Sequence, residues 1–176
     1  MTRRREAPAR GTRLEEQLCF ALYSASRAFT RAYQPLLEPL GLTYPQYLVM
    51  LVLWEGKSLT VSALGTRVGL DSGTLTPLLK RLEHAKLVKR RRGAEDERVV
   101  IVSLSAAGQA LKARAATVPV ELAYRAGFDI DSARPTQVEQ LRESLGELTR
   151  RIAPRKAGPA GPSGVTRRRW AAETSR

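Results

Sequence analysis

Cysteine and histidine are almost absent from this sequence, which has only Cys19 and His84 among its 176 residues. A lone cysteine excludes a disulfide within the chain, and one cysteine with one histidine falls short of a four-ligand zinc site. We therefore expect neither a structural metal ion nor any other cofactor.

Long apolar runs are absent as well. No segment approaches the roughly 18 consecutive apolar residues that a membrane-spanning helix needs. The basic start of the chain, Met1–Arg5, is not followed by the apolar region of a signal peptide. These two absences predict a cytoplasmic protein that does not enter a membrane.

Negative charge is scarce relative to positive charge. Thirty Lys and Arg residues against seventeen Asp and Glu give a formal net charge of +13, with a sequence pI near 10.8. Such an excess attracts nucleic acid, although an anionic membrane surface exerts the same attraction. With 43% hydrophobic residues the chain is able to bury a core, and its length suits one domain with tails.

Two segments rich in Arg, Pro and Gly, 1–13 and 153–176, lack apolar periodicity, and we expect both to be disordered basic tails. Their charge serves either solubility or sequence-independent contact with DNA phosphates. The residues between them, 14–152, form the predicted folded domain.

Helical periodicity begins directly after the first tail. Apolar residues recur at spacings of three and four from Leu18 to Ala32, which predicts a helix that ends before Pro35. Tyr47 and Trp54 bound a second, largely buried helix. Further along the chain, Ser105 is a candidate N-cap of a helix that is interrupted at Pro119.

Thr60 and Asp71 are candidate N-caps of two consecutive helices that are joined by a turn at Gly69. This pattern is a helix-turn-helix. Pro77 lies inside the second helix, where its missing N–H falls near the first turn only if the helix begins at about Ser72.

Two β-prone runs, 87–91 and 99–104, follow the helix-turn-helix and flank a polar segment. They predict a β-hairpin with a charged tip, which is the wing of a winged helix. The predicted fold is therefore mainly α with a small β-hairpin wing, and its DNA-binding core spans about 57–104. At the wing tip, Arg98 is placed to enter the minor groove, or else to pair with Asp96 or Glu95.

A recognition helix needs short hydrogen-bonding side chains near its start for base edges and cations farther along for phosphates. Ser72, Thr74 and Thr76 meet the first requirement, and Lys80 and Arg81 meet the second. The alternative is that these hydroxyl side chains only cap the helix and do not contact DNA.

The last predicted helix, after Pro135, has a narrow apolar face of Val138, Leu141, Leu145, Leu148 and Ile152. The earlier helices already complete the core of the domain, so this apolar face is better covered by a second copy of the chain. We therefore expect a homodimer. Packing against its own domain is the alternative. A two-fold dimer spaces its recognition helices about 34–36 Å apart on a roughly palindromic operator.

Cys19 borders the apolar face of the first helix. Free cysteines are more often inert core residues than sensors, and nothing in the local sequence marks this one as reactive. From the residues alone, a redox role and a packing role both stay open.

Three stretches, Gln17–Arg27, Tyr33–Leu48 and Leu70–Glu83, resemble the MarR family of regulators, as does the wing segment Glu95–Arg98. The cysteine-bearing stretch together with Thr43–Tyr47 resembles its organic-hydroperoxide-sensing branch, the OhrR type. The similarity is close over residues 14–118 and looser over the last helix.

The resemblance implies a peroxide-reactive thiol at Cys19, hydrogen-bonded across the dimer interface by Tyr33 and Tyr44. Ordinary core packing is the alternative for both tyrosines. Because the chain has no second cysteine, it resembles the one-cysteine members, in which oxidised Cys19 reacts with a small external thiol or is oxidised further.

The expected protein is therefore a homodimeric repressor, not an enzyme, that binds a double-stranded operator when reduced and releases it when an organic hydroperoxide oxidises Cys19. Three alternatives stay open. They are a repressor of the same fold released by a small aromatic ligand, a thiol peroxidase, and an architectural protein that binds DNA without sequence preference.

Overall fold

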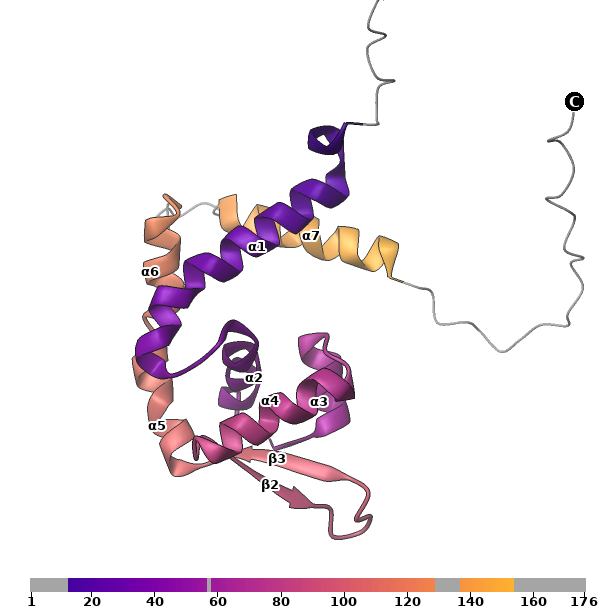
Figure 1. The fold of residues 1–176 in the computed structure, drawn as a ribbon, viewed down its shortest axis with the longest axis vertical. Helices are drawn as coiled ribbons and strands as arrows, with labels where there is room; N and C mark the ends of the chain where they lie inside the picture. Colours follow the sequence, from indigo (N-terminus) through magenta and orange to yellow (C-terminus); the bar gives the residue numbers. More distant parts are fainter. Residues whose placement is uncertain (1–12, 57, 129–136, 154–176) are drawn as a thin grey trace, which may run out of the picture. The chain divides into compact units, whose positions relative to one another are not determined.

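The computed structural model describes residues 13–56, 58–128 and 137–153, in two compact units that divide between residues 131 and 132. Helices dominate the first unit, and a small sheet completes it (Figure 1). Its elements are η1 (Leu14–Glu16), α1 (Leu18–Leu37), η2 (Glu38–Leu40), α2 (Tyr44–Trp54), β1 (Leu59–Thr60), α3 (Val61–Val68), α4 (Ser72–His84), β2 (Val88–Arg92), β3 (Val100–Leu104), α5 (Ala106–Ala115) and α6 (Val118–Arg125). The second unit contains α7 (Gln137–Ile152).

The helix-turn-helix consists of α3 and α4, and side-chain caps set where each helix begins. The hydroxyl of Thr60 accepts a hydrogen bond from the N–H of Ala63 at 3.1 Å, and a carboxylate oxygen of Asp71 accepts one from the N–H of Thr74 at 2.9 Å. Gly69, at φ +70°, ends α3 in a left-handed conformation that favours glycine. The predicted caps and turn are confirmed.

The wing is the antiparallel hairpin of β2 and β3, with Val88 opposite Leu104 and Arg92 opposite Val100. A third strand, β1, pairs with the other edge of β3, so the strand order is β1-β3-β2. The fold class is confirmed, and the hairpin proves to be part of a three-stranded sheet. Two residues are too few to show the alternation that predicts a strand, so β1 was not expected.

The core of the first unit surrounds α2, which is buried on most of its sides. Val49 and Met50 of α2, Leu64 of α3, Leu75 of α4 and Val102 of β3 are all fully buried. This shared core fixes the reading head, which we define as α3, α4 and the wing, against α2.

Of two prolines inside helices, Pro35 departs from the expectation and Pro77 agrees with it. The first helix does not end before Pro35, because α1 continues to Leu37. Pro35 lies in the last turn, where a missing N–H removes a single helical hydrogen bond. Pro77 lies inside α4, which begins at Ser72, five residues earlier.

The first four turns of α1 contain no buried residue, and Leu18, Tyr23 and Phe29 are largely exposed. Helix α7 matches the last predicted helix and likewise has no buried residue. Over the described residues, no single helix is long and apolar enough to cross a membrane. The segment of α1 and η2 reaches that length and apolarity only when it is combined with α2, from which a bend of 69° separates it. The predicted tails lie outside the described residues, except at Arg13 and Ala153.

Candidate DNA interface and thiol site

Helix α4 is amphipathic, and its two faces divide as the sequence predicts. Its buried side chains are Leu75, Leu78, Leu79 and Leu82. Its exposed residues include all five candidate DNA contacts, Ser72, Thr74, Thr76, Lys80 and Arg81. The exposed face therefore presents hydroxyls near its start and cations one to two turns later.

The hydroxyls on this face also serve the helix itself. Thr74 donates to the carboxylate of Asp71 at 2.9 Å, and Thr76 donates to the carbonyl of Ser72 at 2.7 Å. Hydrogen bonds from the backbone N–H and then the hydroxyl of Thr74 hold the pKa of Asp71 below its usual value. Asp71 thus caps α4 as an anion, in agreement with the capping role that the sequence favours.

An ion pair that was not predicted fastens the wing to α4. Arg90 of β2 donates to Glu83 of α4 through its Nε at 2.8 Å, and through its backbone N–H at 3.2 Å. The hydrogen bonds and charge of Arg90 hold the pKa of Glu83 below its usual value. Wing and recognition helix are thereby held in one relative orientation.

A groove of about 390 Å³ lies between α4 and the wing, and it brings together residues far apart in the chain. Ser72 and Thr76 line it from α4, and Arg98 lines it from the wing. Asp96 accepts a hydrogen bond from the backbone N–H of Arg98 at 2.9 Å. Among the described residues the ion pair at the wing tip joins Arg92 to Glu97, and the guanidinium of Arg98 has no such partner.

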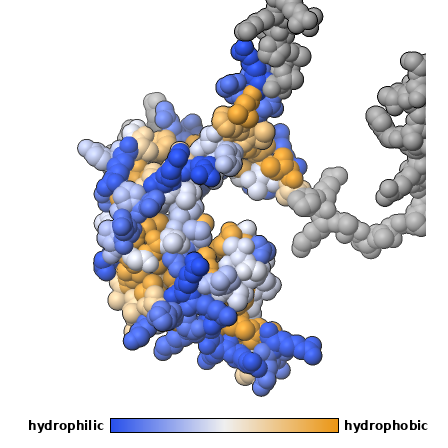
Figure 2. All heavy atoms as spheres, in the orientation of Figure 1, coloured by the Kyte–Doolittle hydropathy of each residue, from blue (hydrophilic) through white to orange (hydrophobic). Residues whose placement is uncertain are grey.

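Hydrophilic residues predominate around the hairpin of β2 and β3, at the bottom of the view in Figure 2, beside a smaller apolar patch. Of the basic residues on β2, Lys89 and Arg91 are exposed and point to the opposite side of the strand from Val88 and Arg90. The wing therefore exposes cationic side chains of the kind that DNA phosphates attract.

Cys19 is exposed in the first turn of α1. Tyr33 lies fourteen residues further along the same helix, which separates the two Cα positions by about 21 Å at the usual helical rise. Within one protomer the thiol and this phenol therefore do not meet. Of the predicted thiol-site residues, Tyr33 and Tyr44 lie together, whereas Cys19 of the same chain lies apart from Tyr33.

Tyr33 belongs instead to an aromatic cluster between α1 and α2. Its ring centroid lies 4.9 Å from that of Tyr44 and 5.7 Å from that of Tyr47. Burial, then the neighbouring Tyr47 and Tyr44, raises the pKa of Tyr33 to about 12. Burial also raises the pKa of Tyr44 and of Tyr47. These phenols stay protonated at neutral pH, and each hydroxyl keeps a hydrogen that it can donate.

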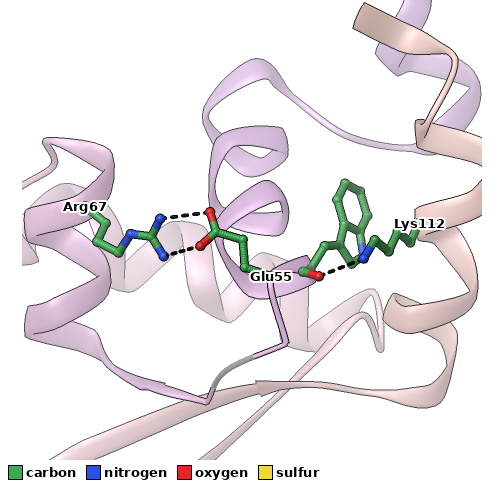
Figure 3. A network of polar contacts seen from close by, with 4 residues as sticks. Glu55, Arg67 and Lys112 are labelled. Carbon is green, nitrogen blue, oxygen red and sulfur yellow. Dashed lines mark hydrogen bonds and ion pairs between the residues drawn. The ribbon is translucent and has the colours of Figure 1, made fainter. Parts of the chain in front are cut away.

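A set of side chains that the sequence did not reveal joins α2 to the helices on either side of it. The indole N–H of Trp54 donates to the carbonyl of Gly108 at 2.8 Å, and Lys112 donates to the carbonyl of Trp54 at 2.9 Å. On the other side, Glu55 accepts two hydrogen bonds from Arg67 of α3, at 2.7 and 2.8 Å (Figure 3). We call the contacts of Trp54 with α5 the α5 joint.

Among the described residues, no group of three or more His, Cys, Asp or Glu side chains lies close enough to hold a metal ion.

Comparison with known proteins identifies the family to which this chain belongs. The family model described as "Transcriptional regulator SarA/Rot" matches residues 31–115. The organic hydroperoxide resistance transcriptional regulator of Bacillus subtilis (strain 168) is 47% identical over 137 residues, which are 74% of this chain and 93% of that protein. The chain belongs to the MarR-like winged-helix transcriptional regulators. As a MarR-like regulator it is a DNA-binding protein rather than an enzyme, and the resemblance drawn from its sequence is confirmed.

Solved structures of AbfR, a protein of Staphylococcus epidermidis, are similar to this MarR-like chain. Reduced AbfR bound to DNA is 34% identical with a TM-score of 0.66, and overoxidized AbfR bound to DNA is 35% identical with a TM-score of 0.63. Each comparison covers 79% of this chain and 94% of the other. A relative with this fold has thus been solved bound to DNA in both a reduced and an overoxidized form.

Proposed function

We propose that this regulator is a redox-responsive repressor, which binds a pseudo-palindromic operator when reduced and releases it when an organic hydroperoxide oxidises Cys19. One observation carries the proposal. A thiol lies exposed on a helix with an exposed apolar stripe, and Tyr33, about 21 Å farther along that helix, packs against Tyr44 of α2. In a dimer, the second copy of the chain places its Cys19 thiol beside these phenols.

Homodimerisation is the first part of the proposal. The apolar residues of α1 and α7 that lie exposed in a single chain become buried when the helices of two copies pack together. Antiparallel packing of the two α1 helices then brings Cys19 of each chain to Tyr33 and Tyr44 of the other. We propose the domain organisation accordingly, with 14–152 as the dimerising winged-helix domain and 57–104 as its DNA-binding core.

DNA recognition is the second part. We propose that Ser72, Thr74 and Thr76 meet base edges in the major groove, because they are exposed at the start of α4. Lys80 and Arg81 farther along α4 then contact phosphates. Arg98 enters the minor groove from the wing, and Asp96 fixes the backbone from which it projects.

The peroxide reaction is the third part. Hydrogen bonds from Tyr33 and Tyr44 stabilise the thiolate, which attacks the terminal oxygen of the hydroperoxide. The O–O bond breaks, Cys19 becomes a sulfenic acid, and the organic fragment leaves as an alcohol after it takes up a proton. A small thiol then converts the sulfenic acid to a mixed disulfide and releases water.

Release of DNA follows from the loss of the phenol contacts. The added bulk on Cys19 displaces Tyr33 and Tyr44 and shifts the dimer toward a state whose two reading heads no longer match successive major grooves. We place this switch in the cytoplasm, where its operator lies.

The test measures binding to an operator duplex by fluorescence anisotropy at fixed salt, before and after stoichiometric cumene hydroperoxide with a small thiol. Wild type is expected to lose its affinity, and Cys19→Ser is expected to keep it. Equal binding in all four conditions contradicts a thiol switch and favours a regulator released by a small aromatic ligand.

A further inference from the structure

The hydroxyl of Tyr47 stands apart from the other polar groups of the core. The side chain is 1% exposed, and its oxygen has no hydrogen-bond partner among the described residues. A buried hydroxyl without a partner destabilises a fold, and phenylalanine fills the same space without that penalty. Packing alone therefore does not account for a tyrosine at this position.

Tyr47 lies on α2 one helical turn after Tyr44, and it contacts the proposed thiol site directly. Its ring centroid is 5.7 Å from that of Tyr33 and 6.3 Å from that of Trp54. After burial, the neighbouring phenols of Tyr47 and Tyr44 raise the pKa of Tyr33, and that of Tyr44 raises the pKa of Tyr47. The titratable groups that face Tyr47 are thus Tyr33 from α1 and Tyr44 from its own helix.

We propose that Tyr47 is a positioning residue of the thiol site, which donates its hydroxyl hydrogen to the phenol oxygen of Tyr33 or Tyr44 while that phenol donates to the partner's Cys19. This inference rests on the proposed function. A phenol that accepts one hydrogen bond becomes a stronger donor in the next, so the chain of donors stabilises the thiolate more than the two outer phenols alone. Tyr47 touches neither the thiol nor the peroxide.

The test is Tyr47→Phe in the full-length dimer, with Tyr124→Phe as the control because Tyr124 is 81% exposed on α6. The melting temperature of the reduced protein is expected to change little, because phenylalanine fills the same space and brings no buried hydroxyl that needs a partner. Operator affinity of the reduced protein is expected to stay unchanged. The second-order rate constant for oxidation by cumene hydroperoxide is expected to fall about fivefold, as for the loss of one hydrogen bond between neutral groups.

Two further measurements separate positioning from packing. The pH profile for alkylation of Cys19 by iodoacetamide is expected to shift to higher pH in Tyr47→Phe, because the thiolate is less stabilised. In a Tyr33→Phe, Tyr44→Phe background, Tyr47→Phe is expected to have no further effect on the oxidation rate, since the outer donors through which it acts are gone.

Wild-type oxidation kinetics and an unshifted pH profile in Tyr47→Phe overturn the inference and leave the proposed function intact. A fall in melting temperature and operator affinity along with the rate also overturns it, since the residue then acts through the fold. If wild type itself keeps its DNA after cumene hydroperoxide and a small thiol, the proposed function fails first.

Discussion

At the scale of single residues, the raised pKa of Tyr33 has a direct consequence for titration. The ordinary pKa of a phenol is near 10, whereas burial and the neighbouring phenols raise that of Tyr33 to about 12. Spectrophotometric titration of phenolate absorbance is expected to show a step near 12 that is missing in Tyr33→Phe. A wild-type curve with every step at the ordinary phenol value contradicts the buried cluster.

The same shift determines how stability depends on pH. Between the unfolded and folded pKa values the native state binds more protons than the unfolded state, so the free energy of unfolding falls as pH rises through this window. The stabilisation is fully present below about pH 10. Urea unfolding at several alkaline pH values is expected to show a smaller loss in Tyr33→Phe than in wild type.

The sequence was sufficient for residues whose partners are close in the chain. Thr60, Asp71 and Ser105 were predicted as caps, and each hydroxyl or carboxylate accepts from an N–H three residues later. The partners of Glu83 and the burial of the Tyr47 hydroxyl depend on how separate elements pack. Sequence patterns do not encode such contacts, so both were missed.

At the scale of elements, α5 approaches the turn between α4 and β2 so closely that Gly108 has room for no side chain. A Cβ there meets the carbonyl oxygen of Leu87 at 2.0 Å. We predict that Gly108→Ala lowers the free energy of unfolding by about 3 kcal/mol, although alanine is the better helix former. Urea denaturation measures this loss.

Gly146→Ala in α7 is the matched control, because its Cβ meets no atom closer than 3.6 Å. Helix propensity then acts alone and favours alanine by up to about 1 kcal/mol. Equal effects of the two substitutions are incompatible with the close approach of α5 to Leu87.

The α5 joint supports a second prediction at this scale. Lys112→Met removes the donor to the carbonyl of Trp54, at the end of α2 where carbonyls lack helical partners. We expect a loss of about 1 kcal/mol in stability and weaker operator binding, because α2 carries the reading head. Lys112→Arg keeps a donor and is expected to restore both stability and operator binding. Urea unfolding measures the stability, and fluorescence anisotropy measures the operator binding. If Lys112→Met behaves like wild type in both assays, the α5 joint does not have this role.

Element boundaries were predictable where amphipathic periodicity and caps coincide, as in α3 and α4. Pro35 was wrongly expected to lie beyond the first helix, because a proline in the last turn removes only one hydrogen bond. Strand β1 gained its place through pairing with β3, which is a tertiary contact rather than a local pattern.

At the scale of the whole molecule, exposed apolar side chains on α7 predict that two chains associate. Leu141 and Leu145 are 52% and 39% exposed. Leu141→Glu with Leu145→Glu is expected to convert the dimer to a monomer in sedimentation velocity and to weaken operator binding, since two half-sites are no longer joined. Circular dichroism is expected to show the first unit still folded.

Arg150→Glu is the control for this substitution, because Arg150 lies on the opposite side of α7. It is expected to leave the dimer intact. If the protein with both glutamates is still a dimer, the interface lies elsewhere.

The most direct test of the central claim asks whether the thiol site is assembled between two protomers. Cys19→Ser chains and Tyr33→Phe, Tyr44→Phe chains are co-expressed with different tags, and the mixed dimer is purified. It contains one site with a thiol from one protomer and both phenols from its partner. Peroxide-dependent release of the operator by the mixed dimer, faster than in either parent homodimer, is the predicted result. A mixed dimer as unresponsive as its parents contradicts the account, because thiol and phenols then do not act together across the interface.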